Sequence, residues 1–126
     1  MSKTVYTQEH EWLRVEEDGL ITVGITDYAQ DHLGDLVFVQ LPETGRELAK
    51  GEEAAVIESV KAAGEINMPV AGVVMEVNTT LADEPGNVNE DPMGIGWFFK
   101  FKLNQPGDLD GFMDDSAYKA YVESQG

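Results

Sequence analysis

One lysine stands out among the residues of this sequence that could do chemistry. Lys61 is the only cationic residue between Gly51 and Phe99, within the stretch "AVIESVKAAGEINMPV". Four glutamates surround it in sequence: Glu52, Glu53, Glu58 and Glu65. A lysine amine presented on a tight turn is a handle for a covalent arm, because acylation forms a stable amide and removes the charge. Its neighbours Val60 and Ala62 offer no charge partner.

Other candidate chemistry is weak. His10 and His32 are the only histidines, and the "HEW" segment fails the HExxH zinc pattern because Arg14 occupies the second histidine position. The loop "DEPGNVNED" is rich in oxygen ligands but lacks the calcium-loop spacing, so we interpret it as a solvated turn. Nucleophile-elbow, phosphate-loop and dinucleotide signatures are absent from the sequence. We therefore predict a protein that is not itself an enzyme, with no metal site.

Length, charge and composition limit the number of domains and the classes of partner that we expect. The chain has 126 residues and a net charge of −16, with a pI near 4.1. This length predicts a single domain over residues 1–126, and the charge disfavours nucleic acid and anionic membrane surfaces as partners. The first residues show neither a signal nor a transit pattern, and no apolar run reaches the roughly 18 residues of a membrane span, so we expect a cytoplasmic protein.

The sequence contains no cysteine. Disulfides, thiolate nucleophiles and thiolate metal sites are thereby excluded. Any thiol or redox chemistry must be carried by an attached group.

Short strands separated by turn residues dominate the pattern. We predict strands over residues 11–15, 20–25, 36–41, 53–60, 65–68, 72–78 and 97–103, with a brief strand in 45–52. A turn over residues 61–64 would place Lys61 at the tip of a hairpin. These features predict a mainly β fold, a small sandwich or barrel.

Helices supplement the predicted sheets. A short helix over residues 26–34 is expected, capped by Thr26 or Asp27 and ended by Gly34 in the left-handed αL conformation. The amphipathic pattern of residues 114–124 predicts a C-terminal helix that packs on the edge or face of a sheet. Residues 79–96 are polar and rich in Pro, Gly and Asn, and predict a loop with little regular structure.

The motifs "EHEWLR", "VGITDYAQDHLGDLVFVQLPETG", "ESVKAAGEINMPVAGVVMEVN" and "GW" at 96–97 resemble the H-protein family of the glycine cleavage system. The resemblance covers roughly residues 6–121. Biotin carriers usually have methionine on both sides of the lysine, and 2-oxoacid dehydrogenase domains usually have aspartate before it; Val60-Lys61-Ala62 matches neither. The implied fold is a flattened barrel-sandwich hybrid of the lipoyl/biotinyl type with a lysine-bearing hairpin.

The resemblance implies a non-catalytic carrier whose cofactor, lipoate, is amide-linked to Lys61. The carrier would take an aminomethyl group from a pyridoxal-phosphate glycine decarboxylase and pass it to a tetrahydrofolate-dependent aminomethyltransferase. A flavin (FAD) dihydrolipoyl dehydrogenase would reoxidise the arm, and a separate lipoate-attaching enzyme would install it. Tethering would give each partner a high effective concentration of substrate.

Two further positions are implied in recognition by the attaching enzyme. They are Glu58, three residues before the lysine, and Gly72, eleven residues after it. Taken without the family, Glu58 is a solvated strand residue and Gly72 is a turn glycine with positive φ. We expect a mixed role for Gly72.

The family's loaded arm folds back into a cleft beside the "HEW" segment and the residues after the lysine. The matching carboxylates are Glu11 and Glu65, with Glu9 nearby. Gly64 departs from the usual serine or threonine, and Glu9 stands where some members have serine. The alternative for the glutamates is that they are solvated surface acids.

Two other functions remain open on sequence. One is an H-like lipoyl relay or store for a different pathway. The other is an unmodified β interaction domain or an ordinary enzyme whose Lys61 is only a surface charge.

Overall fold

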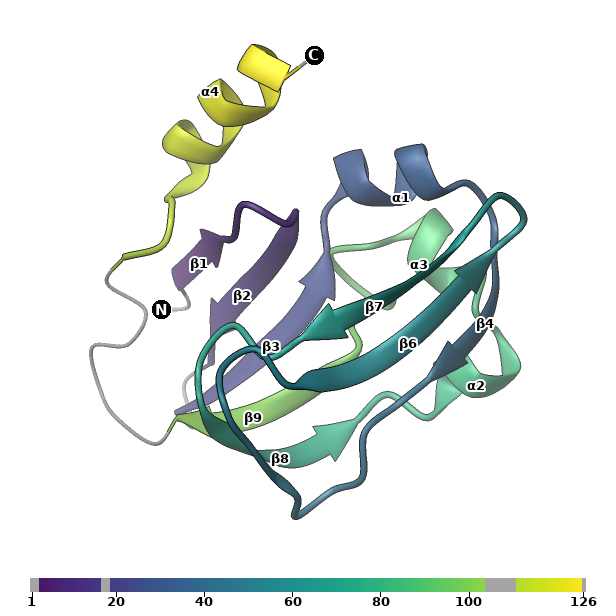
Figure 1. Ribbon diagram of the computed structural model, residues 1–126, viewed down its shortest axis with the longest axis vertical. Helices are drawn as coiled ribbons and strands as arrows, with labels where there is room; N and C mark the ends of the chain where they lie inside the picture. Colours follow the sequence, from purple (N-terminus) through teal and green to yellow (C-terminus); the bar gives the residue numbers. More distant parts are fainter. Residues whose placement is uncertain (1–2, 17–18, 104–110, 126) are drawn as a thin grey trace.

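The computed structural model describes residues 3–16, 19–103 and 111–125. Over these residues the chain forms short strands joined by brief helices (Figure 1). The strands are β1 (Lys3–Tyr6), β2 (Glu11–Val15), β3 (Leu20–Ile25), β4 (Leu36–Gln40), β5 (Glu47–Leu48), β6 (Glu53–Ser59), β7 (Ala63–Asn67), β8 (Gly72–Val77) and β9 (Phe99–Leu103). The helices are α1 (Asp27–Leu33), α2 (Thr80–Asp83), α3 (Asn87–Glu90) and α4 (Asp115–Gln125).

Two antiparallel sheets build the fold, and neither closes into a barrel. In the described residues the larger sheet has the order β1-β2-β3-β9-β8-β5, and the smaller has the order β4-β6-β7. Figure 1 shows the β6–β7 hairpin passing in front of the larger sheet, with its tip at the end where α1 lies. The prediction of a mainly β sandwich with helical additions is confirmed.

The core lies between the sheets. Leu13, Ile21 and Phe99 from the larger sheet are fully buried, and Ile57 and Ile66 from the hairpin face them in the same cluster. Burying each such side chain contributes about 1.5–3 kcal/mol. The core therefore fixes the hairpin rigidly on the larger sheet.

A second apolar cluster holds the C-terminal helix. Tyr118 of α4 stacks on Tyr6 of β1 with ring centroids 4.6 Å apart. Its hydroxyl lies 2.7 Å from Thr26 Oγ1 and 2.9 Å from His10 Nδ1. The Asp114 carboxylate caps α4 by accepting a hydrogen bond from the Ala117 amide. As expected, α4 lies at a sheet edge, beside β1.

The prediction for residues 79–96 is wrong, because this segment forms α2 and α3. Each helix places one apolar residue, Leu81 or Val88, fully inside the core. One apolar anchor per four-residue helix is too little to show a helical period in the sequence, so tertiary burial decides the structure here.

The predictions for the two ends of helix α1 are confirmed only in part. Thr26 caps it, since its hydroxyl accepts a hydrogen bond from the Ala29 amide. Gly34 ends it with φ 81 and ψ −166, a positive-φ region open almost only to glycine, but this is not the predicted αL conformation. Among the described residues no helix is long and apolar enough to cross a membrane.

Candidate functional site

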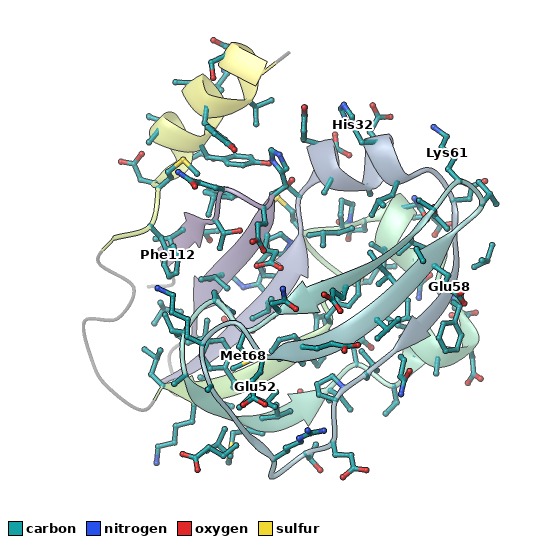
Figure 2. All side chains as sticks on the ribbon, in the orientation of Figure 1. His32, Glu52, Glu58, Lys61, Met68 and Phe112 are labelled. Atoms are coloured by element: carbon teal, nitrogen blue, oxygen red, sulfur yellow. The ribbon has the colours of Figure 1, made fainter. Side chains whose placement is uncertain are left out.

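Lys61 lies in the turn between β6 and β7, and its side chain is exposed. Pairing of Glu58 with Ala63 closes the hairpin one step before this turn. The turn is therefore tighter than the predicted 61–64, because β7 begins at Ala63. Figure 2 shows the Lys61 side chain extending from the tip, away from the sheets. The Lys61 side chain is therefore accessible to another molecule.

Ser59 fixes the shape of this turn, a role not predicted from the sequence. Its hydroxyl accepts hydrogen bonds from the Lys61 amide (3.2 Å) and the Ala62 amide (3.0 Å) and donates to the Ala62 carbonyl (3.0 Å). The Ser59 amide also donates to the Ala62 carbonyl at 2.7 Å. A serine that opens a four-residue turn is a recognisable local signal for such bonds. Lys61 thus stands on an ordered turn.

The loop after α1 supports the turn from the side. The Val60 amide donates to the Asp35 carbonyl at 3.0 Å. A Cβ built on Gly34 would lie 3.3 Å from Lys61 Cε, so the lysine stem passes directly over this glycine. The absence of a side chain at Gly34 leaves space for the stem.

The structure separates the two residues implied in recognition by an attaching enzyme. Glu58 is exposed near the hairpin tip, as Figure 2 shows, one strand position from the turn that holds Lys61. Gly72 lies at the opposite end of the hairpin, buried in β8 between Leu48 of β5 and Leu103 of β9. The interpretation of Gly72 as a turn glycine with positive φ is wrong. A Cβ there would lie 2.5 Å from the Phe101 ring, so close packing explains this glycine.

A cavity of about 400 Å³ opens beside the hairpin, between β2, α1 and β7. The three carboxylates implied for the loaded arm, Glu9, Glu11 and Glu65, all line it. Apolar residues, among them Ile25 and Ile57, form its floor. The structure therefore brings together side chains from three separate segments of the chain.

The three carboxylates differ sharply in environment. Glu11 is 4 % exposed, and its amide donates to Thr7 Oγ1 at 3.2 Å. Glu9 and Glu65 are exposed. Glu65 pairs with Val56, so strand alternation turns its side chain to the face opposite Ile66, and it reaches the cavity only at the rim. The description of all three as solvated surface acids is wrong for Glu11.

Burial raises the pKa of Glu11 from its ordinary value of 4.5 to about 8, and the nearby charge of Glu9 adds to the rise. Hydrogen bonds from the Thr7 hydroxyl and the Asn67 backbone oppose it. At neutral pH the carboxyl group of Glu11 is therefore largely protonated.

This carboxyl predicts a specific pH dependence of stability. Between pH 4.5 and about 8 the folded chain binds more protons at Glu11 than the unfolded chain does. The free energy of unfolding should therefore fall as the pH rises through this window and level off above it. Glu11→Gln, uncharged at every pH, should remove this component and stabilise the fold at pH 8. Urea unfolding of both proteins at pH 5, 6.5 and 8 measures it; parallel curves would contradict the assignment.

Both histidines border the same cavity, a position not predicted from the sequence. His10 is half-buried with φ 70, a conformation uncommon outside glycine, and its ring packs against Tyr28 at 4.5 Å between centroids. His32 Nδ1 lies 2.9 Å from the Tyr28 carbonyl oxygen. In the part of the chain that the structure describes, no group of three His, Asp or Glu side chains could hold a metal ion.

A second cavity, of about 370 Å³, shares Glu9 and Glu11 with the first and continues toward Met68 and Phe112. Glu11 therefore lines both cavities.

Comparisons with known proteins point in one direction. A family model described as "Glycine cleavage H-protein" matches residues 4–125. The chain is 57 % identical over 122 residues to the glycine cleavage system H protein of Rhodospirillum rubrum, covering 97 % of each chain. It is 56 % identical to that of Methylocella silvestris, covering 94 % of each. A crystal structure of the H protein from Mycobacterium marinum matches with a TM-score of 0.84 and 36 % identity, over 98 % of this chain and 97 % of that one.

Proposed function

This chain belongs to the glycine cleavage H-protein family, whose members are lipoyl carriers, and from that premise we propose that Lys61 is the residue that carries the lipoyl group. The observation that supports this most directly is the exposed Lys61 amine on a turn held by Ser59. The residues present fit such a group, since an attaching enzyme can reach the amine and a cavity of about 400 Å³ lies beside the same hairpin. When bound, the group supplies a dithiol–disulfide pair for taking and releasing the aminomethyl unit of glycine.

The chain works with the other components of the glycine cleavage system. We propose that these partners are a pyridoxal-phosphate glycine decarboxylase, a tetrahydrofolate-dependent aminomethyltransferase and a flavin dihydrolipoyl dehydrogenase, together with an enzyme that acylates Lys61. The protein contributes attachment and delivery. In this proposal its own side chains do not catalyse the making or breaking of covalent bonds.

Glu11 is proposed to hold the amino end of the cargo. The cargo amine is protonated near neutral pH, and its positive charge would lower the pKa of Glu11 toward ionisation. The resulting carboxylate accepts a charge-assisted hydrogen bond in a site shielded by Ile25 and Ile57. Glu9 and Glu65 add negative charge from the rim. The apolar floor keeps water from the cargo.

Glu11→Gln and Glu65→Gln should therefore differ in how long the isolated protein keeps its cargo. Glu11→Gln keeps a side-chain oxygen as acceptor but removes its negative charge, so release should speed up by about tenfold, the difference between a charge-assisted and a neutral hydrogen bond. Glu65 is solvated, so its loss should change release by less than about threefold. Formaldehyde appearing from the loaded protein measures both rates, with Glu53→Gln as the control at the far end of β6. Equal rates in all four proteins would show that this cavity does not protect the cargo.

Reconstitution tests the proposed function as a whole. Purified chain, acylated at Lys61, should support glycine-dependent formation of methylene-tetrahydrofolate when the three partner enzymes are added. An acylated chain that accepts no aminomethyl group from the decarboxylase would instead identify a lipoyl relay or store for another pathway.

A further inference from the structure

Three large apolar side chains are exposed around the tip of the lysine hairpin. They are Val60, which is 66 % exposed, Val37 at 57 % and Phe38 at 43 %. We call these three residues the tip patch. Among the described residues only three other large apolar side chains are similarly exposed, Met75, Met93 and Ile95. Single exposed apolar residues are ordinary on protein surfaces, but a cluster beside a reactive group marks an interaction site.

The backbone brings the tip patch together. Val60 belongs to the turn, and its amide donates to the Asp35 carbonyl just before β4 begins. A β-bulge between Leu36 and Phe38 shifts the register of β4 against β6. The bulge lets the consecutive residues Val37 and Phe38 both face solvent, where a regular strand would turn one of them inward. The local irregularity thus enlarges the apolar surface next to Lys61.

Acidic groups border the tip patch. Phe38 pairs with Glu58 across the strands, so both side chains lie on the outer face of the smaller sheet. Asp35 and Glu58 are both exposed. The surface next to Lys61 is therefore an apolar centre with a negative rim, which is complementary to a partner that has an apolar centre and cationic side chains around it.

The geometry points to one occupant: we propose that the tip patch is the docking surface for the enzyme that acylates Lys61. This inference rests on the proposed function, in which an enzyme acylates Lys61. An acylating enzyme must bring its active site to the amine itself, so its surface must come within one lysine side chain of the turn, where Val60 lies. Enzymes that act on the cargo meet the far end of a long arm and have no such requirement.

The test compares acylation of Phe38→Thr and Val60→Thr with wild type. Threonine is β-branched like Val60 and is compatible with a strand at Phe38, and in both positions it reduces the apolar surface area. With a purified lipoate-attaching enzyme, kcat/KM should fall at least about fivefold for each variant, mainly through KM, as for truncation of an interface anchor. Met75→Thr is the matched control, since Met75 is 49 % exposed on β8 of the other sheet. It should stay within about twofold of wild type.

Each outcome decides the proposal. Wild-type kcat/KM in both Phe38→Thr and Val60→Thr would overturn it, and so would an equal loss in Met75→Thr, which would show a general effect of surface change. If Phe38→Thr melts below wild type, Val60→Thr decides, because its side chain lies in the turn outside the strands. Rates of cargo transfer that fall while acylation stays at wild type would assign the tip patch to a cargo enzyme and overturn the proposal. Absence of acylation in wild type itself is a different result, the failure of the proposed function.

Discussion

Lys61→Arg should abolish carriage while leaving the fold intact. Arginine keeps the positive charge but offers no amine that forms a stable amide with an acyl group. Lys61 is exposed and lies outside both apolar clusters, so the free energy of unfolding should change by less than about 0.5 kcal/mol. Glycine cleavage in the reconstituted system should drop to the background seen without the carrier. The measurement is methylene-tetrahydrofolate formation with equal amounts of wild type and variant.

Lys102→Arg is the matched control, because Lys102 is an exposed lysine on β9 of the other sheet. It should carry cargo at the wild-type rate. Lys61→Arg protein that still supports cleavage would show that the arm is attached elsewhere.

Gly72→Ala should lower the free energy of unfolding by about 3 kcal/mol, at the upper end of the usual cost of overpacking. A Cβ at this position would lie 2.5 Å from the Phe101 ring and 2.6 Å from the Lys102 carbonyl oxygen. The carbonyl belongs to the backbone of β9, which pairs with β8, so it cannot rotate away. Relief would require the two strands to separate locally. Urea unfolding measures the loss as a lower midpoint.

Gly86→Ala controls for the general effect of replacing glycine. Gly86 has φ −63 and nothing within 4 Å of a built Cβ, so alanine should be neutral or slightly stabilising there. If Gly72→Ala unfolds at the wild-type midpoint but is acylated slowly, Gly72 acts in recognition and the packing explanation is wrong. Rates should be expressed per folded molecule, because a fold defect alone would reduce acylation.

Local sequence was sufficient for much of the framework. Strands β2 and β3 begin and end at the predicted residues because turn residues flank both, and Ile21, Val23 and Ile25 alternate along β3. The hairpin and its exposed lysine follow from the same signals. The prediction failed where a residue's neighbours come from distant segments. Helices α2 and α3 were not predicted, because they depend on the burial of Leu81 and Val88 in the core. The reason for glycine at position 72 was also missed, because it lies in the packing of β9 against β8.

The cavity illustrates the same limit. A resemblance to the family singled out Glu9, Glu11 and Glu65, but only the fold shows that Glu11 is buried and the other two are not. Strand alternation alone could not assign the inward face of β2, because Glu11, Trp12 and Leu13 are consecutive and all buried. Both faces of this strand are covered, because Leu13 packs into the core on one side and Trp12 packs into the cluster that holds α4 on the other.

Peptide mapping by mass spectrometry tests the central claim most directly. The chain, purified from its native host, should carry the mass of one lipoyl group, and fragmentation should place it on Lys61 within the peptide that spans β6 and β7. We predict this single modification and none on Lys50 or Lys102. An unmodified Lys61 in protein from cells that actively cleave glycine, or a lipoyl group on another lysine, would contradict it.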